Sequence, residues 1–274
     1  MIISVIRGIV FMSNPIGIRG VIGVVILSVI AAFLIGGIIM SVFSSTPNQT
    51  DKVYLYLSFF LGQGVIIVPP IYYLNFKKKS ISDSFRLKPV SFNTIINSII
   101  FSIGIIILFD ALDRVIHQIV PTPDYIIDLG KIMQPESTLG LIFLFLAVVV
   151  MAPIGEEIVF RGFLQKFLEE YWKDITRAVL VTSLFFAMIH FNPYWTIQIY
   201  LLGVILGFLS WKTKSVIPSV ILHSINNGMA FILTVSDEYN VDFYFWGNYV
   251  SPVFIIIAIY LSYYSINKIN HINT

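Results

Sequence analysis

The chain contains no cysteine, which excludes disulfide bridges and metal sites built on thiolates. Charge is also scarce, because only 12% of the residues are Asp, Glu, Lys or Arg. A soluble domain keeps roughly a quarter of its residues charged, so this chain cannot cover a water-facing surface in the usual way. The net charge of +2 is too small, and the basic runs are too short, for a nucleic-acid partner.

Hydrophobic residues, by contrast, make up 57% of the sequence, and its mean hydropathy is +0.87. One bilayer crossing takes about 20 apolar helical residues. The sequence therefore predicts an all-α, polytopic membrane protein of about eight transmembrane helices in contact with membrane lipid. The expected spans lie near residues 20–43, 53–76, 94–113, 138–157, 178–194, 196–211, 215–235 and 249–267. Residues 1–12 contain Arg7 and are more typical of an interfacial helix.

The placement of lysine and arginine predicts the orientation of these spans. With the N-terminus in the cytoplasm, 14 of the 17 basic residues fall on the cytoplasmic side. The three on the outer side are Lys52, Arg114 and Lys131. We therefore expect both termini in the cytoplasm, and a composition rich in Ile, Asn and Lys favours a bacterial plasma membrane. Neither an internal repeat nor a linker is evident, so residues 1–274 are expected to form one membrane domain.

Polar residues lie in three of the expected spans, although a charge near the bilayer centre costs at least ~2.5 kcal/mol on insertion scales. The three motifs are Glu156-Glu157-xxx-Arg161, Phe186-xxx-His190 and His223-xxx-Asn227. The first is expected at the cytoplasmic end of the fourth span, the second inside the fifth and the third inside the seventh. Because each motif has a proline nearby, we expect it to border a hydrated space.

Helical spacing indicates how these side chains are arranged. Glu157 and Arg161 are four residues apart with the acid first, the favoured order for an ion pair. Glu156 lies about 100° further around the helix and is free to face elsewhere. His223 and Asn227 share one helix face. The depths of the three motifs predict that they converge below the membrane midplane, in a buried polar cavity that faces the cytosol.

Peptide hydrolysis needs a general base for water and donors that stabilise the tetrahedral oxyanion. In one scheme Glu156 takes the proton from water with His190 sharing or orienting it, while His223 and Asn227 donate to the oxyanion. In a second scheme Glu156, His190 and His223 hold a zinc ion whose bound water attacks. The residues alone fit both schemes, so no cofactor is certain and zinc is the one to consider.

Each motif also has a structural interpretation. The two glutamates fit an interfacial acid pair neutralised by nearby cations, and each histidine fits an interhelical hydrogen bond without catalytic use. Glu157, Arg161 and Phe186 are expected to support the site rather than to react.

The order and spacing of the motifs resemble the CPBP intramembrane protease family, also called the Abi or CAAX-protease-like family. Its pattern EExxxR, FxxxH, HxxxN is intact here, and the resemblance covers roughly residues 140–230. The resemblance implies an eight-helix fold with Glu156, His190, His223 and Asn227 as the catalytic set. It further implies endopeptidase activity on a peptide or membrane protein, conventionally classed as metalloendopeptidase, with bacteriocin immunity among the roles of bacterial relatives.

Two other functions use the same residues differently. One is a non-catalytic membrane scaffold or immunity protein on the same fold, although such a protein would tolerate loss of the motifs. The other is a proton-coupled transporter working through Glu156 and His190, which usually shows paired repeats that are not evident here.

Overall fold

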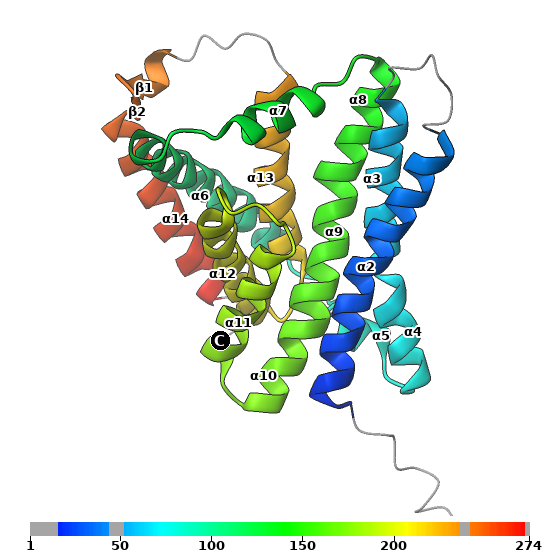
Figure 1. The fold of residues 1–274 in the computed structure, drawn as a ribbon. Helices are drawn as coiled ribbons and strands as arrows, with labels where there is room; N and C mark the ends of the chain where they lie inside the picture. Colours follow the sequence, from blue (N-terminus) through cyan, green and yellow to red (C-terminus); the bar gives the residue numbers. More distant parts are fainter. Residues whose placement is uncertain (1–15, 44–51, 236–241, 272–274) are drawn as a thin grey trace, which may run out of the picture.

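The computed structural model describes residues 16–43, 52–235 and 242–271; for residues 242, 270 and 271 it describes the backbone only. The interfacial helix expected at residues 1–12 lies outside these ranges. Throughout the described part the chain is almost entirely helical, as Figure 1 shows. The predicted all-α, polytopic membrane protein is confirmed.

The first helices form one side of the molecule. Helix α2 (Ile18–Phe43) packs against α3 (Val53–Val65), and α4 (Val68–Phe76) continues the span of α3 after a break. Prolines occupy the first turn of α4, where a missing backbone N–H costs no helical hydrogen bond. A short helix, α5 (Ile81–Ser84), follows at the lysine-rich end.

A single long column runs through the middle of the molecule (Figure 1). Its segments are α8 (Thr138–Phe145), η1 (Leu146–Met151), α9 (Ala152–Glu157), η2 (Ile158–Gln165) and α10 (Lys166–Trp172). The two η segments are π-helical. The prediction that the fourth span ends at residue 157 is wrong, because the helix continues to Trp172 and Glu156 lies near its middle.

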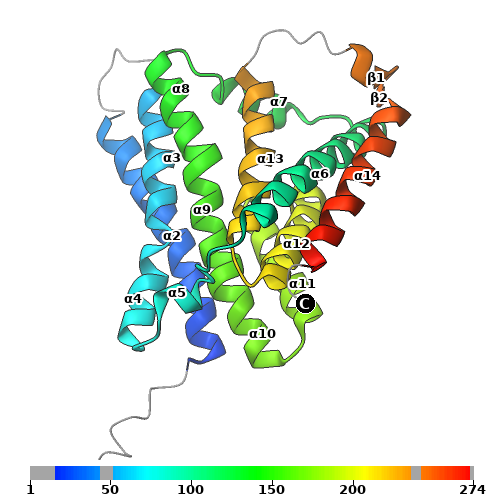
Figure 2. The ribbon, with the colours of Figure 1, turned by 180° about the vertical axis from the view of Figure 1, so that it is seen from behind.

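The remaining helices lie on the other side of the column, as Figure 2 shows from behind. Helix α6 (Phe92–Ile119) packs along α14 (Pro252–His271), and α7 (Asp124–Ile132) crosses the end opposite to the lysines. Helices α11 (Ile175–Met188), α12 (Thr196–Thr213) and α13 (Ile217–Val235) fill the space between. The turn η3 (Asp242–Tyr244) leads into a small hairpin of β1 (Phe245–Trp246) and β2 (Tyr249–Val250).

Seven helices of the described chain are long and apolar enough to cross a membrane, one fewer than the eight expected. The missing one is α11, whose 14 residues reach only about 21 Å at 1.5 Å per residue. Asp174 begins it by accepting a hydrogen bond from the Arg177 amide, and the helix ends at Met188. The expected fifth span, near residues 178–194, is therefore six residues too long at its end.

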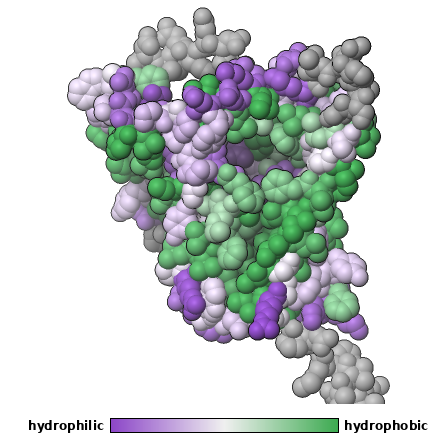
Figure 3. Space-filling view, in the orientation of Figure 1, coloured by the Kyte–Doolittle hydropathy of each residue, from purple (hydrophilic) through white to green (hydrophobic). Residues whose placement is uncertain are grey.

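Apolar side chains cover the middle of the molecule and polar ones both ends, as Figure 3 shows. On α2, for example, Ile30, Phe33, Leu34 and Ile38 are all exposed. Lipid tails can cover such a surface, whereas water cannot without cost. Figure 3 also shows a recess with polar residues inside it, in the half that carries α7. The predicted opening toward the cytosol stays a prediction, since this recess lies away from the lysine-rich end.

Candidate active site

The column that carries the two glutamates is π-helical on both sides of them, in η1 and η2. Single π-turns inside α-helices are rare and occur frequently at functional sites. In η1 the Ala152 amide donates to the Ala147 carbonyl, five residues back. The next amide in this register would belong to Pro153, which has no N–H to donate.

Asn227 of α13 donates a hydrogen bond to the carbonyl that Pro153 leaves without a partner. Its Nδ2 donates to the Val148 oxygen at 3.0 Å, five residues before Pro153. The amide has a second N–H, and its Oδ1 lies 3.3 Å from Nδ2 of Asn226. Pro153 and Asn227 thus join α13 to the column beside the glutamates.

Glu157 and Arg161 form the ion pair that their spacing predicts. The distance between Glu157 Oε1 and one guanidinium nitrogen of Arg161 is 2.8 Å, and both side chains are 0% exposed. The guanidinium carbon of Arg161 lies 4.0 Å from the ring centroid of Phe186. A second guanidinium nitrogen, Nη2, donates to the Gly203 carbonyl at 3.3 Å. The buried cation therefore has a carboxylate, an aromatic face and a backbone carbonyl as partners.

His223 lies between the two glutamates. Its Nδ1 is 3.0 Å from Glu157 Oε1, and its Nε2 is 3.9 Å from Glu156 Oε2. The carboxylate of Glu157 is already oriented by Arg161, so it holds the imidazole ring and directs Nε2 toward Glu156. Glu156 Oε2 is buried and has no hydrogen-bond partner among the described residues.

Phe186 connects both histidines. Its ring centroid lies 4.8 Å from that of His190 and 5.7 Å from that of His223, edge-on in each case. His190 Nδ1 is 2.7 Å from the Phe186 carbonyl, so the neutral tautomer that donates there leaves Nε2 as an acceptor.

The prediction that His190 lies inside a membrane span is wrong, because α11 ends two residues earlier. Asn192 shapes the turn that follows by accepting from the amides of Tyr194 and Trp195. His190 is exposed, and within the described ranges neither a hydrogen bond nor an ion pair joins it to Glu156. Of the two histidines expected near Glu156, His223 approaches it at 3.9 Å, whereas the role of His190 stays a prediction.

The residues considered for zinc do not form a ligand cluster. The described part of the chain holds no group of three or more His, Cys, Asp or Glu side chains placed to bind a metal ion. Glu156 and His223 approach each other, but His190 does not complete the set, and Glu157 is bonded to Arg161.

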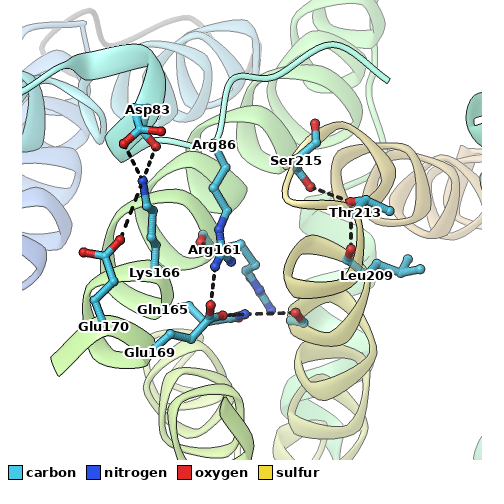
Figure 4. Close-up of polar contacts among 11 residues, drawn as sticks. Asp83, Arg86, Arg161, Gln165, Lys166, Glu169, Glu170, Leu209, Thr213 and Ser215 are labelled. Carbon is cyan, nitrogen blue, oxygen red and sulfur yellow. Dashed lines mark hydrogen bonds and ion pairs between the residues drawn. The ribbon is translucent and has the colours of Figure 1, made fainter. Parts of the chain in front are cut away.

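Gln165 was not expected from the motifs. It is fully buried and donates to the Gly207 carbonyl at 2.9 Å. It also donates to Glu169 at 2.8 Å, and Figure 4 labels both of these side chains. Arg161 and Gln165 thus reach carbonyls of Gly203 and Gly207, four residues apart on each helix. The small-xxx-small spacing of these glycines is a known signal of close helix packing in membranes, and it could have indicated this contact.

Comparison with known proteins identifies the segment that carries this site. Residues 138–229 match the family described as "Type II CAAX prenyl endopeptidase Rce1-like". The chain is also 27% identical over 146 residues to the "UPF0177 protein YbdI" of Lactococcus lactis subsp. lactis (strain IL1403), covering 51% of this chain and 78% of that protein. No solved structure matches the chain. Through the segment that carries Glu156, His190 and His223, the chain is similar to the Rce1-like family of type II CAAX prenyl endopeptidases.

Proposed function

We propose that this protein is an intramembrane endopeptidase that cleaves a peptide bond of a membrane-associated or hydrophobic peptide or protein. The observation that carries the proposal is the pairing of Glu156 with His223 inside an apolar bundle. Glu156 Oε2 is buried without a hydrogen-bond partner among the described residues and lies 3.9 Å from an imidazole nitrogen. Such a costly group inside a membrane protein favours a functional role. The match of this segment to a family of endopeptidases supports the same activity.

In the proposed reaction Glu156 takes a proton from a water molecule that attacks the scissile carbonyl, and it returns this proton to the leaving amine as the C–N bond breaks. His223, when protonated, donates from both ring nitrogens, so Nδ1 keeps its bond to Glu157 while Nε2 donates to the oxyanion. The second N–H of Asn227 adds a further donor, and His190 offers Nε2 to orient the water.

Glu157, Arg161 and Phe186 position these groups without reacting themselves. Glu157 fixes the ring of His223, Arg161 fixes Glu157, and Phe186 lies against both imidazoles. The catalytic core proposed here spans residues 140–230 of a single domain, 1–274. We place it in a bacterial plasma membrane with both termini in the cytoplasm.

The zinc scheme and the name metalloendopeptidase receive no support from the described side chains. Glu156, His190 and His223 are not arranged as three ligands, so we derive no step through a metal ion.

The experiment that tests the proposal compares the wild-type protein with Glu156→Gln, which keeps the shape of the side chain and removes its basicity. N-terminal peptides from membranes of cells expressing each variant identify the cleaved proteins. Synthetic peptides spanning those cleavage sites are then incubated with purified protein in liposomes. General-base catalysis contributes about 10²–10⁴-fold, so we expect cleavage by Glu156→Gln to fall by at least about 100-fold.

Glu170→Gln is the matched control, because Glu170 lies on the same column but its side chain is 64% exposed and distant from His223. This variant should cleave like the wild type. If Glu156→Gln cleaves equally well, the protease proposal fails. If cells keep their phenotype with that variant although no peptide is cut, a non-catalytic scaffold or immunity role replaces it.

A further inference from the structure

A pocket of about 450 Å³ opens at the lysine-rich end of the molecule. None of Glu156, His190, His223 and Asn227 lines it, so it is separate from the candidate active site. Five basic residues line its wall: Arg86, Lys88, Lys166, Lys173 and Lys214. We call it the basic pocket, and Figure 4 shows part of its wall.

Three acidic residues also line the basic pocket, but each already has a basic partner there. Lys166 Nζ lies 2.9 Å from Asp83 Oδ2 and 3.8 Å from Glu170 Oε1, and Arg86 forms an ion pair with Glu169 (Figure 4). The hydrogen bond from Lys166, together with the charge of that lysine, lowers the pKa of Asp83. These acids are therefore neutralised within the pocket.

Two cations remain in excess. Among the described residues, neither Lys173 nor Lys214 has a carboxylate within ion-pair distance. Burial lowers the pKa of Lys214, and the nearby charges of Arg86 and Lys212 lower it further against the opposing effect of Glu169. Burial is the largest of these effects, and an anion beside the ammonium group would oppose it by favouring the charged form.

The backbone at these positions is also unfavourable for lysine. Arg86, Lys173 and Lys214 have φ values of 53°, 56° and 55°, in the left-handed region. This conformation is unfavourable for a non-glycine residue, whereas glycine adopts it freely. Lysines at the carboxyl ends of α10 and α12 gain a smaller stabilisation from the helix dipoles. Lys173 and Lys214 thus carry a conformational cost that their interaction with the helix dipoles alone does not offset.

Because each of the two lysines follows the last residue of a membrane span, we expect both at the level of the lipid headgroups. Lys173 directly follows the membrane span Thr138–Trp172, and Lys214 directly follows the span Thr196–Thr213. Trp211, a side chain typical of the membrane interface, lines the same pocket, and Lys214 Nζ lies 5.2 Å from its ring centroid. Basic pockets between spans at this level are suited to phosphate-bearing lipid headgroups.

We propose that the basic pocket binds the phosphate of an anionic phospholipid headgroup, with Lys173 and Lys214 as its direct ligands. The proposal does not depend on protease activity.

The test measures the unfolding temperature of the purified full chain in neutral detergent with three additives: dihexanoyl phosphatidylglycerol, dihexanoyl phosphatidylcholine and inorganic phosphate. A ligand that binds only the folded state raises this temperature. We expect phosphatidylglycerol to raise it more than either other additive. The double variant Lys173→Gly, Lys214→Gly should lose this difference, and it should fold, because glycine suits the left-handed backbone at both positions.

The matched control is Lys78→Gly, Lys79→Ala, which removes two charges at the same end, outside the pocket, with Lys78 also left-handed at φ 53°. It should keep the wild-type response to phosphatidylglycerol. The proposal is overturned if the pocket variant responds like the wild type, or if the control loses the response equally. Equal effects of phosphatidylglycerol and phosphatidylcholine would also overturn it. An equal effect of inorganic phosphate would assign the pocket to a soluble anion instead of a lipid.

Discussion

At the scale of single residues, the orientation of His223 depends on a carboxylate that serves two partners. Glu157 Oε1 is 2.8 Å from Arg161 and 3.0 Å from His223 Nδ1, in surroundings from which water is excluded. A buried ion pair is costly to form, but removing one member is costlier, because the other charge is left without its counter-ion. Replacing Glu157 alone should therefore destabilise the protein more than replacing Glu157 and Arg161 together, whereas both changes should leave His223 without the carboxylate that orients it.

Glu157→Leu should destabilise the protein by about 3–5 kcal/mol, because Arg161 would then be a buried charge without a carboxylate. The double variant Glu157→Leu, Arg161→Met should recover at least half of that loss, since both charges are replaced by apolar groups of similar size. Both variants should lose peptide cleavage, because neither fixes His223. Reversible unfolding in mixed micelles measures stability; a double variant less stable than Glu157→Leu would contradict the assigned role of the pair.

Spacing within one helix could be predicted from the sequence, and spacing between helices could not. The pairing of Glu157 with Arg161 follows from their separation of four residues. The approach of His223 to Glu156 depends on how α13 packs against the column, which no local pattern indicates. His190 was placed in a helix because apolar residues continue past it, although the Asn192-Pro193 turn ends that helix. Its part in the reaction stays a prediction.

At the scale of elements, the π-helical segments are the feature that the sequence showed least. Apolar residues surround the glutamates on all sides of the column, so no periodicity distinguishes a π-turn from an α-turn there. Pro153 was a visible signal, but it was interpreted only as a mark of hydrated space. Its consequence is that the Val148 carbonyl accepts a hydrogen bond from Asn227, which lies 79 residues later on another helix.

The close contact between α12 and the column leads to a prediction about Gly207. A Cβ atom at this position would lie 2.7 Å from Gln165 Oε1 and 3.0 Å from Val179 Cγ1. Gly207→Ala should therefore displace Gln165 from its bond to the Gly207 carbonyl and destabilise the protein by about 1–3 kcal/mol, as overpacking does in other cores. Unfolding measured under the same conditions as for the Glu157 variants checks this value.

Gly23→Ala on α2 is the matched control, because nothing lies within 4 Å of a Cβ atom there. It should be neutral, or more stable by up to about 1 kcal/mol through helix propensity. If Gly207→Ala is equally harmless, the packing of α12 against Gln165 is looser than its distances indicate.

At the scale of the whole molecule, the lengths of α11 and of the column explain the position of His190. The column has 35 residues and reaches roughly 50 Å, more than the about 30 Å of a bilayer core. Helix α11 returns from the lysine-rich end but stops after 14 residues, inside the bundle. Non-helical backbone at membrane depth is tolerated only beside protein or water-filled space. The turn that carries His190 therefore fits a hydrated recess within the bundle.

The orientation of the molecule in the membrane can be tested because the chain has no cysteine of its own. Lys78 follows α4 at the lysine-rich end, whereas Lys131 lies on α7 at the opposite end, and both are exposed. The distribution of basic residues predicts that the first faces the cytoplasm and the second the outside. A membrane-impermeant maleimide should label Lys131→Cys in intact cells and Lys78→Cys only after permeabilisation, with the cysteine-free parent as the blank. The reverse pattern would place the recess beside α7 on the cytoplasmic side and the basic pocket outside.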